Sequence, residues 1–287
     1  MSITDKIGVL VIHGMGAQEE GYSKNFENEV TGFLGGSAKQ FVWQEIYWAK
    51  ALELRESDLW RRMEAAKNPQ GTKIPLDWQS IRNFVVHNFG DALAYHRDTL
   101  KNSAYDDIHA IVSARVKNLK DALPDPSSPI VVVAHSLGGH IMSNYIWDHQ
   151  ASNERAAGLE PIPTLVAMIT FGCNIPLFAL SFAKATPIDV PGKGVKKPAL
   201  IAASRWLNFV DRDDVLGWPL KPLYEMSNAN LTEAEKRTVQ GIEDYEINVG
   251  GLVTSWNPAA HSAYWEDNDL TRPVAAYLQT LLKALNT

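Results

Sequence analysis

The stretch that decides the fold is Ile130-Val131-Val132-Val133-Ala134-His135-Ser136-Leu137-Gly138-Gly139. Its leading apolar run is typical of a strand that is buried on both faces of a parallel sheet. The residues that follow match a small-x-Ser-x-Gly turn, in which Gly138 stands where a side chain would collide with the turning backbone. Such a turn holds a serine hydroxyl clear of the strand, where a base and backbone N–H groups can reach it.

Strand and helix patterns alternate on both sides of this turn. Apolar, aromatic and β-branched runs predict strands at residues 7–12, 41–48, 130–133, 165–171, 200–210 and 243–249. Helical spacing of apolar residues predicts helices at 26–34, 108–119, 137–146 and 274–285. We expect Thr271 to cap the last of these helices, with Pro273 in its first turn. The alternation predicts an α/β fold with a mostly parallel sheet flanked by helices, formed by residues 1–287 as a single domain.

Two segments interrupt the alternation. Residues 49–105 predict a helical insertion between the early strands and the strand that precedes Ser136, with helices at 54–63 and 78–95 and a turn at residues 68–71. The second of these helices has an apolar stripe, formed by Ile81, Phe84, Val85, Phe89, Ala92 and Tyr95. The stripe fits either ordinary core packing or the inner face of a mobile cap or lid. Residues 175–198 form a loop-rich excursion with four prolines.

Composition excludes several classes of protein. The chain has 287 residues, a formal net charge of -6 and a sequence pI near 5.8, which argues against binding to nucleic acid. The single cysteine, Cys173, allows no internal disulfide, and no Cys/His cluster has the spacing of a zinc site. We find no signal segment and no run long enough to span a membrane. We therefore expect a cytoplasmic protein with no membrane-spanning segment, no metal and no cofactor.

A serine nucleophile needs a base, and the carboxyl ends of the strands bring candidate loops together at one edge. Of the eight histidines, seven have another local explanation. They lie in helices, adjoin the serine or shape the loop after the first strand: His13, His87, His96, His109, His135, His140 and His149. His261, in the predicted loop 259–265, remains as the candidate base.

The acid that orients the base has three candidates. Asp211, Asp213 and Asp214 all follow the strand predicted at 200–210. A solvated acidic turn or a calcium cluster is the alternative, although Arg212 interrupts the cluster.

The loop His13-Gly14-Met15-Gly16 can approach the serine closely because of its glycines. The N–H groups of Met15 and Leu137 are therefore the candidate donors of an oxyanion hole.

These three motifs resemble those of α/β-hydrolases, and among them bacterial lipases and serine esterases with an Ala-x-Ser-x-Gly elbow. The loop at His13 resembles the family's oxyanion loop, the turn at Ser136 its nucleophile elbow, and His261 falls where the family places its histidine. The family's pattern of Asp-x followed by two apolar residues matches Asp213-Asp214-Val215-Leu216, which favours Asp213 as the acid.

The resemblance implies an α/β-hydrolase fold and a Ser136-His261-Asp213 triad that cleaves carboxylic esters through an acyl-enzyme. The substrate would be a small-molecule or lipid ester. A thioesterase or an amidase would use the same triad, and a binding protein that keeps the fold without catalysis is the alternative from another class. Cys173 is a weaker candidate nucleophile, more simply explained as a small buried residue. The resemblance does not cover residues 49–105 and 175–198, so it does not extend to acyl and alcohol specificity.

Overall fold

A computed structural model describes residues 5–16, 18–95, 103–181, 184–226, 231–250 and 260–287. Its centre is a six-stranded sheet with the strand order β2-β1-β3-β4-β5-β6, in which every neighbouring pair is parallel. The strands are β1 (Ile7–Ile12), β2 (Phe41–Ile46), β3 (Ile130–His135), β4 (Leu165–Phe171), β5 (Arg205–Asp211) and β6 (Ile242–Ile247). The predicted parallel α/β sheet is therefore confirmed.

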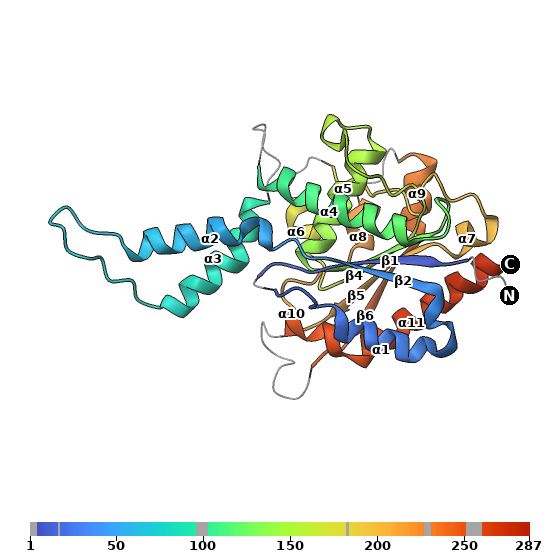
Figure 1. The fold of residues 1–287 in the computed structure, drawn as a ribbon, viewed down its shortest axis with the longest axis horizontal. Coiled ribbons are helices and arrows are strands. Elements are labelled where there is room, and N and C mark those ends of the chain that lie inside the picture. The colour runs from blue at the N-terminus through green and yellow to red at the C-terminus, as the bar shows by residue number, and fades with distance from the viewer. Residues whose placement is uncertain (1–4, 17, 96–102, 182–183, 227–230, 251–259) are drawn as a thin grey trace.

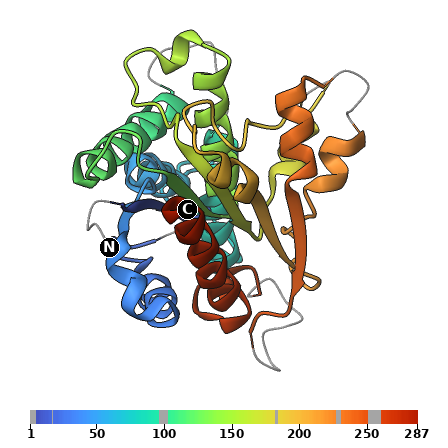
Figure 2. The same cartoon turned by 90° about the vertical axis from the view of Figure 1, so that its right-hand side faces the viewer.

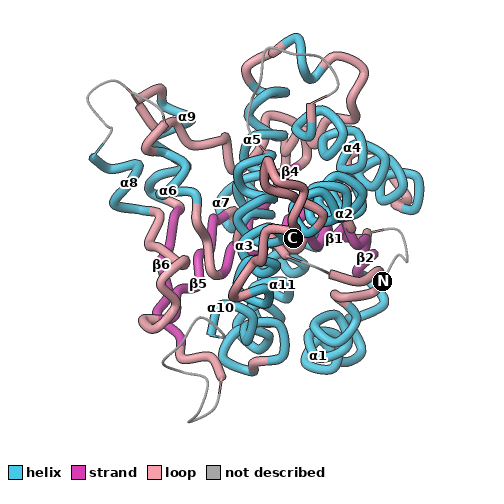
Figure 3. The backbone as a smooth tube through the Cα atoms, turned by 90° about the vertical axis from the view of Figure 1, so that its left-hand side faces the viewer, coloured by secondary structure: helices cyan, strands magenta, loops and turns pink. Residues whose placement is uncertain are grey.

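Helices cover both faces of the sheet (Figures 1 and 2). In the described part of the chain they are α1 (Lys24–Leu34), α2 (Lys50–Glu64), α3 (Gln79–Ala94), α4 (Ala104–Ala122), α5 (Leu137–Gln150), α6 (Ile175–Ala179), α7 (Pro198–Ala203), α8 (Lys221–Met226), α9 (Glu233–Gln240), α10 (Ala260–Ala263) and α11 (Asn268–Asn286). Figure 3 shows α1 and α11 together on one side of the sheet and α4 and α5 on the other. This layered arrangement, with a helical insertion between β2 and β3, agrees with the expected α/β-hydrolase fold.

Alternation of side chains along the strands divides the core into two halves. On β1, Ile7, Val9 and Val11 pack into the cluster that contains α1 and α11, whereas Leu10 and Ile12 pack into the cluster that contains α4 and α5. The strand is apolar throughout because both of its faces are covered. Ser136 follows β3 directly and therefore lies at the carboxyl end of a central strand.

The insertion forms an arm, which we define as α2, α3 and the connecting residues 65–78. Figure 1 shows the two helices lying side by side and extending away from the sheet. The predicted turn is present, with the Gly71 N–H donating to the Asn68 carbonyl at 2.9 Å. Tyr95 of the predicted stripe is buried, while the side chains of Ile81, Phe84, Val85 and Phe89 lie outside the described residues. A role of the arm as a lid stays a prediction.

Several element boundaries differ from the sequence prediction. The strand expected from residue 200 begins at Arg205, because Pro198 starts α7 and the chain reaches β5 only after that helix. Asp267, rather than Thr271, caps α11, since its side chain accepts a hydrogen bond from the Asp269 N–H. Helices α6, α8 and α9 were not expected, because each is too short to show a repeated apolar stripe. Among the described residues, no helix is long and apolar enough to cross a membrane.

Candidate active site

The turn at Ser136 has the geometry of a strained strand-to-helix elbow. Ser136 has φ 50° and ψ -124°, a conformation that few residues other than glycine adopt. Its N–H donates to the Phe171 carbonyl at 3.0 Å, and its carbonyl accepts from the Gly139 N–H at 3.0 Å. These bonds fasten the elbow to β4 on one side and to the first turn of α5 on the other.

Two glycines allow backbone segments to meet at the elbow. A Cβ added to Gly138 would lie 2.4 Å from the His13 carbonyl oxygen, and a Cβ added to Gly14 would lie 2.6 Å from the Cβ of Ser136. Position 138 therefore needs a glycine for two reasons: the tight turn after Ser136, and the close approach of the loop at His13. The approach of Gly14 contributes to the complete burial of Ser136.

His261 joins the serine to a carboxylate. Its Nε2 lies 2.7 Å from Ser136 Oγ, and its Nδ1 lies 2.9 Å from each carboxylate oxygen of Asp214. His261 belongs to α10, a short helix in the segment that the sequence predicted as a loop. A carboxylate accepts only, so Nδ1 carries a proton and Nε2 is free to accept the proton of the serine hydroxyl.

The carboxylate that contacts His261 is Asp214, so the expectation of Asp213 is wrong. The Asp213 N–H donates to Asp211 Oδ1 at 2.7 Å, and Asp211 also accepts from the Val249 N–H at 2.6 Å. Asp211 thus closes the turn after β5, and the turn directs the third residue after it towards His261. Gly217 leaves room for this carboxylate, since an added Cβ there would lie 2.6 Å from Asp214 Oδ2.

The surroundings of Asp214 keep it ionised at neutral pH. Burial acts to raise the pKa of its carboxyl, but hydrogen bonds from His261, the Leu216 N–H and Tyr264 outweigh it and lower the pKa below its usual value of 3.8. The two supporting bonds measure 2.9 Å from the Leu216 N–H and 3.0 Å from the Tyr264 hydroxyl. The carboxylate is therefore held by donors on both sides and can stabilise a charged imidazole.

The loop after β1 is held by His13, as its sequence context suggested. His13 Nδ1 donates to the Gly14 carbonyl at 2.7 Å, its Nε2 accepts from the Trp48 N–H at 3.2 Å, and its ring stacks on Trp48. Burial lowers the pKa of His13 to about 3, so the ring is neutral. Met15, one of the two predicted oxyanion donors, follows Gly14, and Leu137, the other, is the first residue of α5.

Two further residues fix the site from neighbouring elements, and sequence reasoning did not find their roles. Asp91 of α3 accepts a hydrogen bond from the Gly16 N–H at 2.8 Å, which ties the base of the arm to the glycine loop. His135 Nε2 donates to the carbonyl of His261 at 2.7 Å. Because burial lowers the pKa of His135 to about 3, its ring is neutral and serves to hold α10 against the end of β3.

Asn174 is a third residue that sequence reasoning did not identify. It lies just beyond β4, is only 1% exposed, and its Nδ2 is 3.5 Å from Ser136 Oγ. No motif marks it, because its approach to Ser136 depends on the pairing of β3 with β4. The preceding residue, Cys173, is fully buried, and burial raises the pKa of its thiol to about 12. That thiol is therefore protonated and a poor nucleophile at neutral pH.

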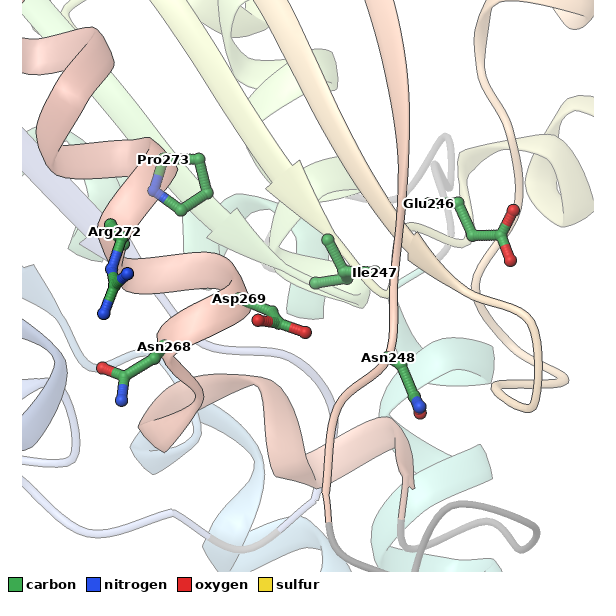
Figure 4. Close-up of a pocket in the computed structure, with 7 residues that line it drawn as sticks. All are labelled: Glu246, Ile247, Asn248, Asn268, Asp269, Arg272 and Pro273. Atoms are coloured by element: carbon green, nitrogen blue, oxygen red, sulfur yellow. The ribbon is translucent and has the colours of Figure 1, made fainter.

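Two of the cavities among the described residues differ in how close they lie to Ser136, His261 and Asp214. One, of about 860 Å³, extends along α5 between α3 and α6, and its lining includes Tyr95, His140, Asn144, Ile175 and Phe178. Ile175 in this lining is the residue directly after Asn174. The other, of about 560 Å³, lies between the end of β6 and the first turns of α11 (Figure 4), and Ser136, Asp214 and His261 do not line it. In the described segments, no group of three or more His, Cys, Asp or Glu side chains is arranged to hold a metal ion.

Comparisons with known proteins give structural similarity at low sequence identity. No family model matches the sequence, and no curated protein matches it. A novel cutinase-like protein from Cryptococcus sp. aligns with a TM-score of 0.42 and 10% identity, over 98% of this chain and 97% of that one. A soluble variant of monoglyceride lipase from Saccharomyces cerevisiae, in complex with a substrate analog, aligns with a TM-score of 0.41 and 13% identity, over 98% and 87%. Both TM-scores are below 0.5, so the chemistry of this site is argued from its own geometry.

Proposed function

We propose that this protein is a serine hydrolase that cleaves carboxylic esters through an acyl-enzyme. The observation that carries the proposal is the continuous contact from Ser136 Oγ through the His261 ring to the Asp214 carboxylate, at 2.7 and 2.9 Å. A nucleophile, a base and an orienting acid in this order are the arrangement required for acyl transfer.

In the first half of the reaction, Ser136 Oγ forms a bond to the ester carbonyl carbon while its proton passes to His261 Nε2. The negative charge moves to the carbonyl oxygen, where the N–H groups of Met15 and Leu137 are the proposed donors. Asp214 stabilises the imidazolium without taking its proton. The tetrahedral intermediate then breaks its bond to the alcohol oxygen, which leaves with the proton from His261.

In the second half, a water molecule attacks the acyl-enzyme and gives one proton to His261. Collapse of the second intermediate breaks the bond to Ser136 Oγ, returns the proton to that oxygen and releases the carboxylic acid. Because Ser136 is fully buried, substrate access requires movement of the residues that cover it, among them Gly14. The contact between Asp91 and Gly16 places the base of the arm where it can influence that movement.

Hydrolysis of p-nitrophenyl butyrate by the intact chain tests the proposal. Ser136→Ala removes the nucleophile and should lower kcat by about a million-fold, as expected when a triad serine is lost. Ser262→Ala is the matched control, because Ser262 adjoins His261 in the sequence but is exposed, and it should retain full activity. A folded Ser136→Ala variant with the activity of the unmodified protein would refute the proposal.

A further inference from the structure

The side chain of Asn174 lies beside the proposed nucleophile with a defined orientation. Its Nδ2 is 3.5 Å from Ser136 Oγ, and Asn174 is 1% exposed. The residue precedes α6, and its neighbour Ile175 lines the cavity of about 860 Å³. Asn174 therefore contacts Ser136 and is followed in the chain by a residue that lines open space, which a substrate can occupy.

Counting protons determines which end of the amide faces Ser136. The serine hydroxyl has one proton, and His261 Nε2 at 2.7 Å is its acceptor, because His261 Nδ1 donates to Asp214. Ser136 Oγ can then only accept from Asn174, and only the NH₂ end of the amide can donate. The carbonyl end, Oδ1, points elsewhere.

Asn174 Oδ1 is a buried acceptor with no hydrogen-bond donor in the described structure. Buried amide oxygens in folded proteins are almost always paired, so an unpaired one beside a reactive group calls for a specific partner. Both ends of the amide are attached to the same carbon, so the unpaired Oδ1 belongs to the same group that contacts Ser136 Oγ through Nδ2.

We infer that Asn174 Oδ1 accepts a hydrogen bond from the substrate, which is an ester with a hydroxyl or N–H donor no more than two carbons from its ester group. The inference rests on the proposed function. The donor can belong to the acyl part, as in a 2-hydroxy acid ester, or to the alcohol part, as in a 2-hydroxyethyl ester. Asn174 is then a specificity-determining residue, because a substrate without the donor leaves its oxygen unpaired in the complex.

The test compares kcat/KM for ethyl butyrate, ethyl 2-hydroxybutyrate and 2-hydroxyethyl butyrate, measured in a pH-stat. Each value is divided by the rate constant for alkaline hydrolysis of the same ester, which removes differences in intrinsic reactivity. We expect the intact protein to prefer one hydroxylated ester over ethyl butyrate by about tenfold or more, since a buried acceptor discriminates strongly against a missing donor. The preferred ester identifies the side of the substrate that carries the donor.

Asn174→Leu keeps the size of the side chain and removes both polar ends, so it should abolish this preference. Asn174→Ala serves the same purpose if the leucine variant does not fold. Asn28→Leu is the control, because Asn28 is exposed on α1 and does not line this cavity, and it should retain the preference.

Hydrolysis of all three esters without preference, or a preference that survives in the folded Asn174 variants, would overturn the inference and leave the proposed function intact. No hydrolysis of any of the three esters, together with no labelling of Ser136 by a fluorophosphonate, would overturn both.

Discussion

At the carboxyl edge of the sheet, Ser136, Asp214 and His261 are at most 8% exposed, whereas along the arm Leu54 and Trp78 are 83% and 75% exposed. The first region buries polar groups and the second exposes apolar ones. Buried polar groups need partners, and Ser136, His261 and Asp214 are each fixed by hydrogen bonds to one another. Exposed side chains have no such constraint, and the arm can tolerate changes that the site cannot.

A hydrogen bond from the Gly16 N–H to Asp91, near the end of α3, joins the two regions. Asp91 is 3% exposed, in contrast to Leu93, which is 79% exposed two residues later. The boundary between the rigid site and the exposed arm therefore lies within the last turns of α3. Four predictions test this contrast, in order of decreasing effect.

The largest effect should come from the acid. Asp214→Asn leaves the shape of the side chain but removes the charge that stabilises the imidazolium, so kcat should fall by about 10⁴-fold. Asp213→Asn is the control, because the Asp213 side chain has no described contact with His261, and it should change kcat less than threefold, on the order of ordinary surface substitutions. Steady-state hydrolysis of an activated ester measures both. The reverse ranking would restore Asp213 as the acid.

A smaller effect should follow from crowding the acid. In Gly217→Ala the new Cβ would lie 2.6 Å from Asp214 Oδ2, which forces the carboxylate away from His261 and should lower kcat by about 10²-fold. Gly32→Ala in α1 is the control, since an added Cβ there meets nothing within 4 Å. Equal activities of the two variants, measured with the same ester, would show that the position of Asp214 is not critical.

The sequence predicted best what local patterns determine. Strand β1 was predicted because a strand buried on both faces needs an unbroken apolar run. The elbow at Ser136 was predicted because its tight turn needs small neighbouring residues. His261 was found by elimination. Asp214, the proposed acid, was not selected because three carboxylates share one turn, and the bonds of Asp211 to Asp213 and Val249 decide which of them faces His261.

Other features depend on contacts between segments that are distant in the chain. Asn174 approaches Ser136 because β3 pairs with β4. No motif near residue 174 in the sequence indicates this contact. The projection of the arm was also not expected, since its apolar stripe suggested either core packing or the inner face of a lid. Periodicity indicates that a helix can bury one face, but not whether a partner for that face exists in the same chain.

The third prediction concerns pH and the buried histidines. Burial lowers the pKa of His140 to about 3, whereas the unfolded chain takes up the same proton near pH 6.5. The stability contributed by neutral His140 is complete above about pH 6.5 and decreases as the pH falls towards 3, by about 1.4 kcal/mol per pH unit. His140→Phe keeps the stacking on Phe178 and removes this dependence.

Urea unfolding at pH 7, 5.5 and 4.5 measures the difference. The free energy of unfolding of the unmodified protein should fall more steeply with decreasing pH than that of His140→Phe. His149→Phe is the comparison, because His149 is only half-buried, and it should reduce the slope less. Identical slopes for the unmodified protein and His140→Phe would show that His140 does not have a lowered pKa.

The smallest effect should come from the arm. Leu54→Gln and Trp78→Asn replace exposed apolar side chains, and each should change the free energy of unfolding by less than about 0.5 kcal/mol. Asparagine suits position 78, where φ is 60°. Trp48→Ala, at a fully buried position, should cost about 3 to 5 kcal/mol. A loss above 2 kcal/mol, on the order of a core substitution, for either arm variant would show that the arm packs against something and would remove the contrast between the two regions.

The most direct test of the central claim is the identification of the residue labelled by a fluorophosphonate probe, by mass spectrometry of proteolytic peptides. We predict a single adduct on Ser136 in the intact protein, and loss of that adduct in His261→Ala, because the base is required to activate the hydroxyl. An adduct on another residue, or no adduct on a protein shown to be folded, would contradict the assignment of Ser136, His261 and Asp214 as an active site.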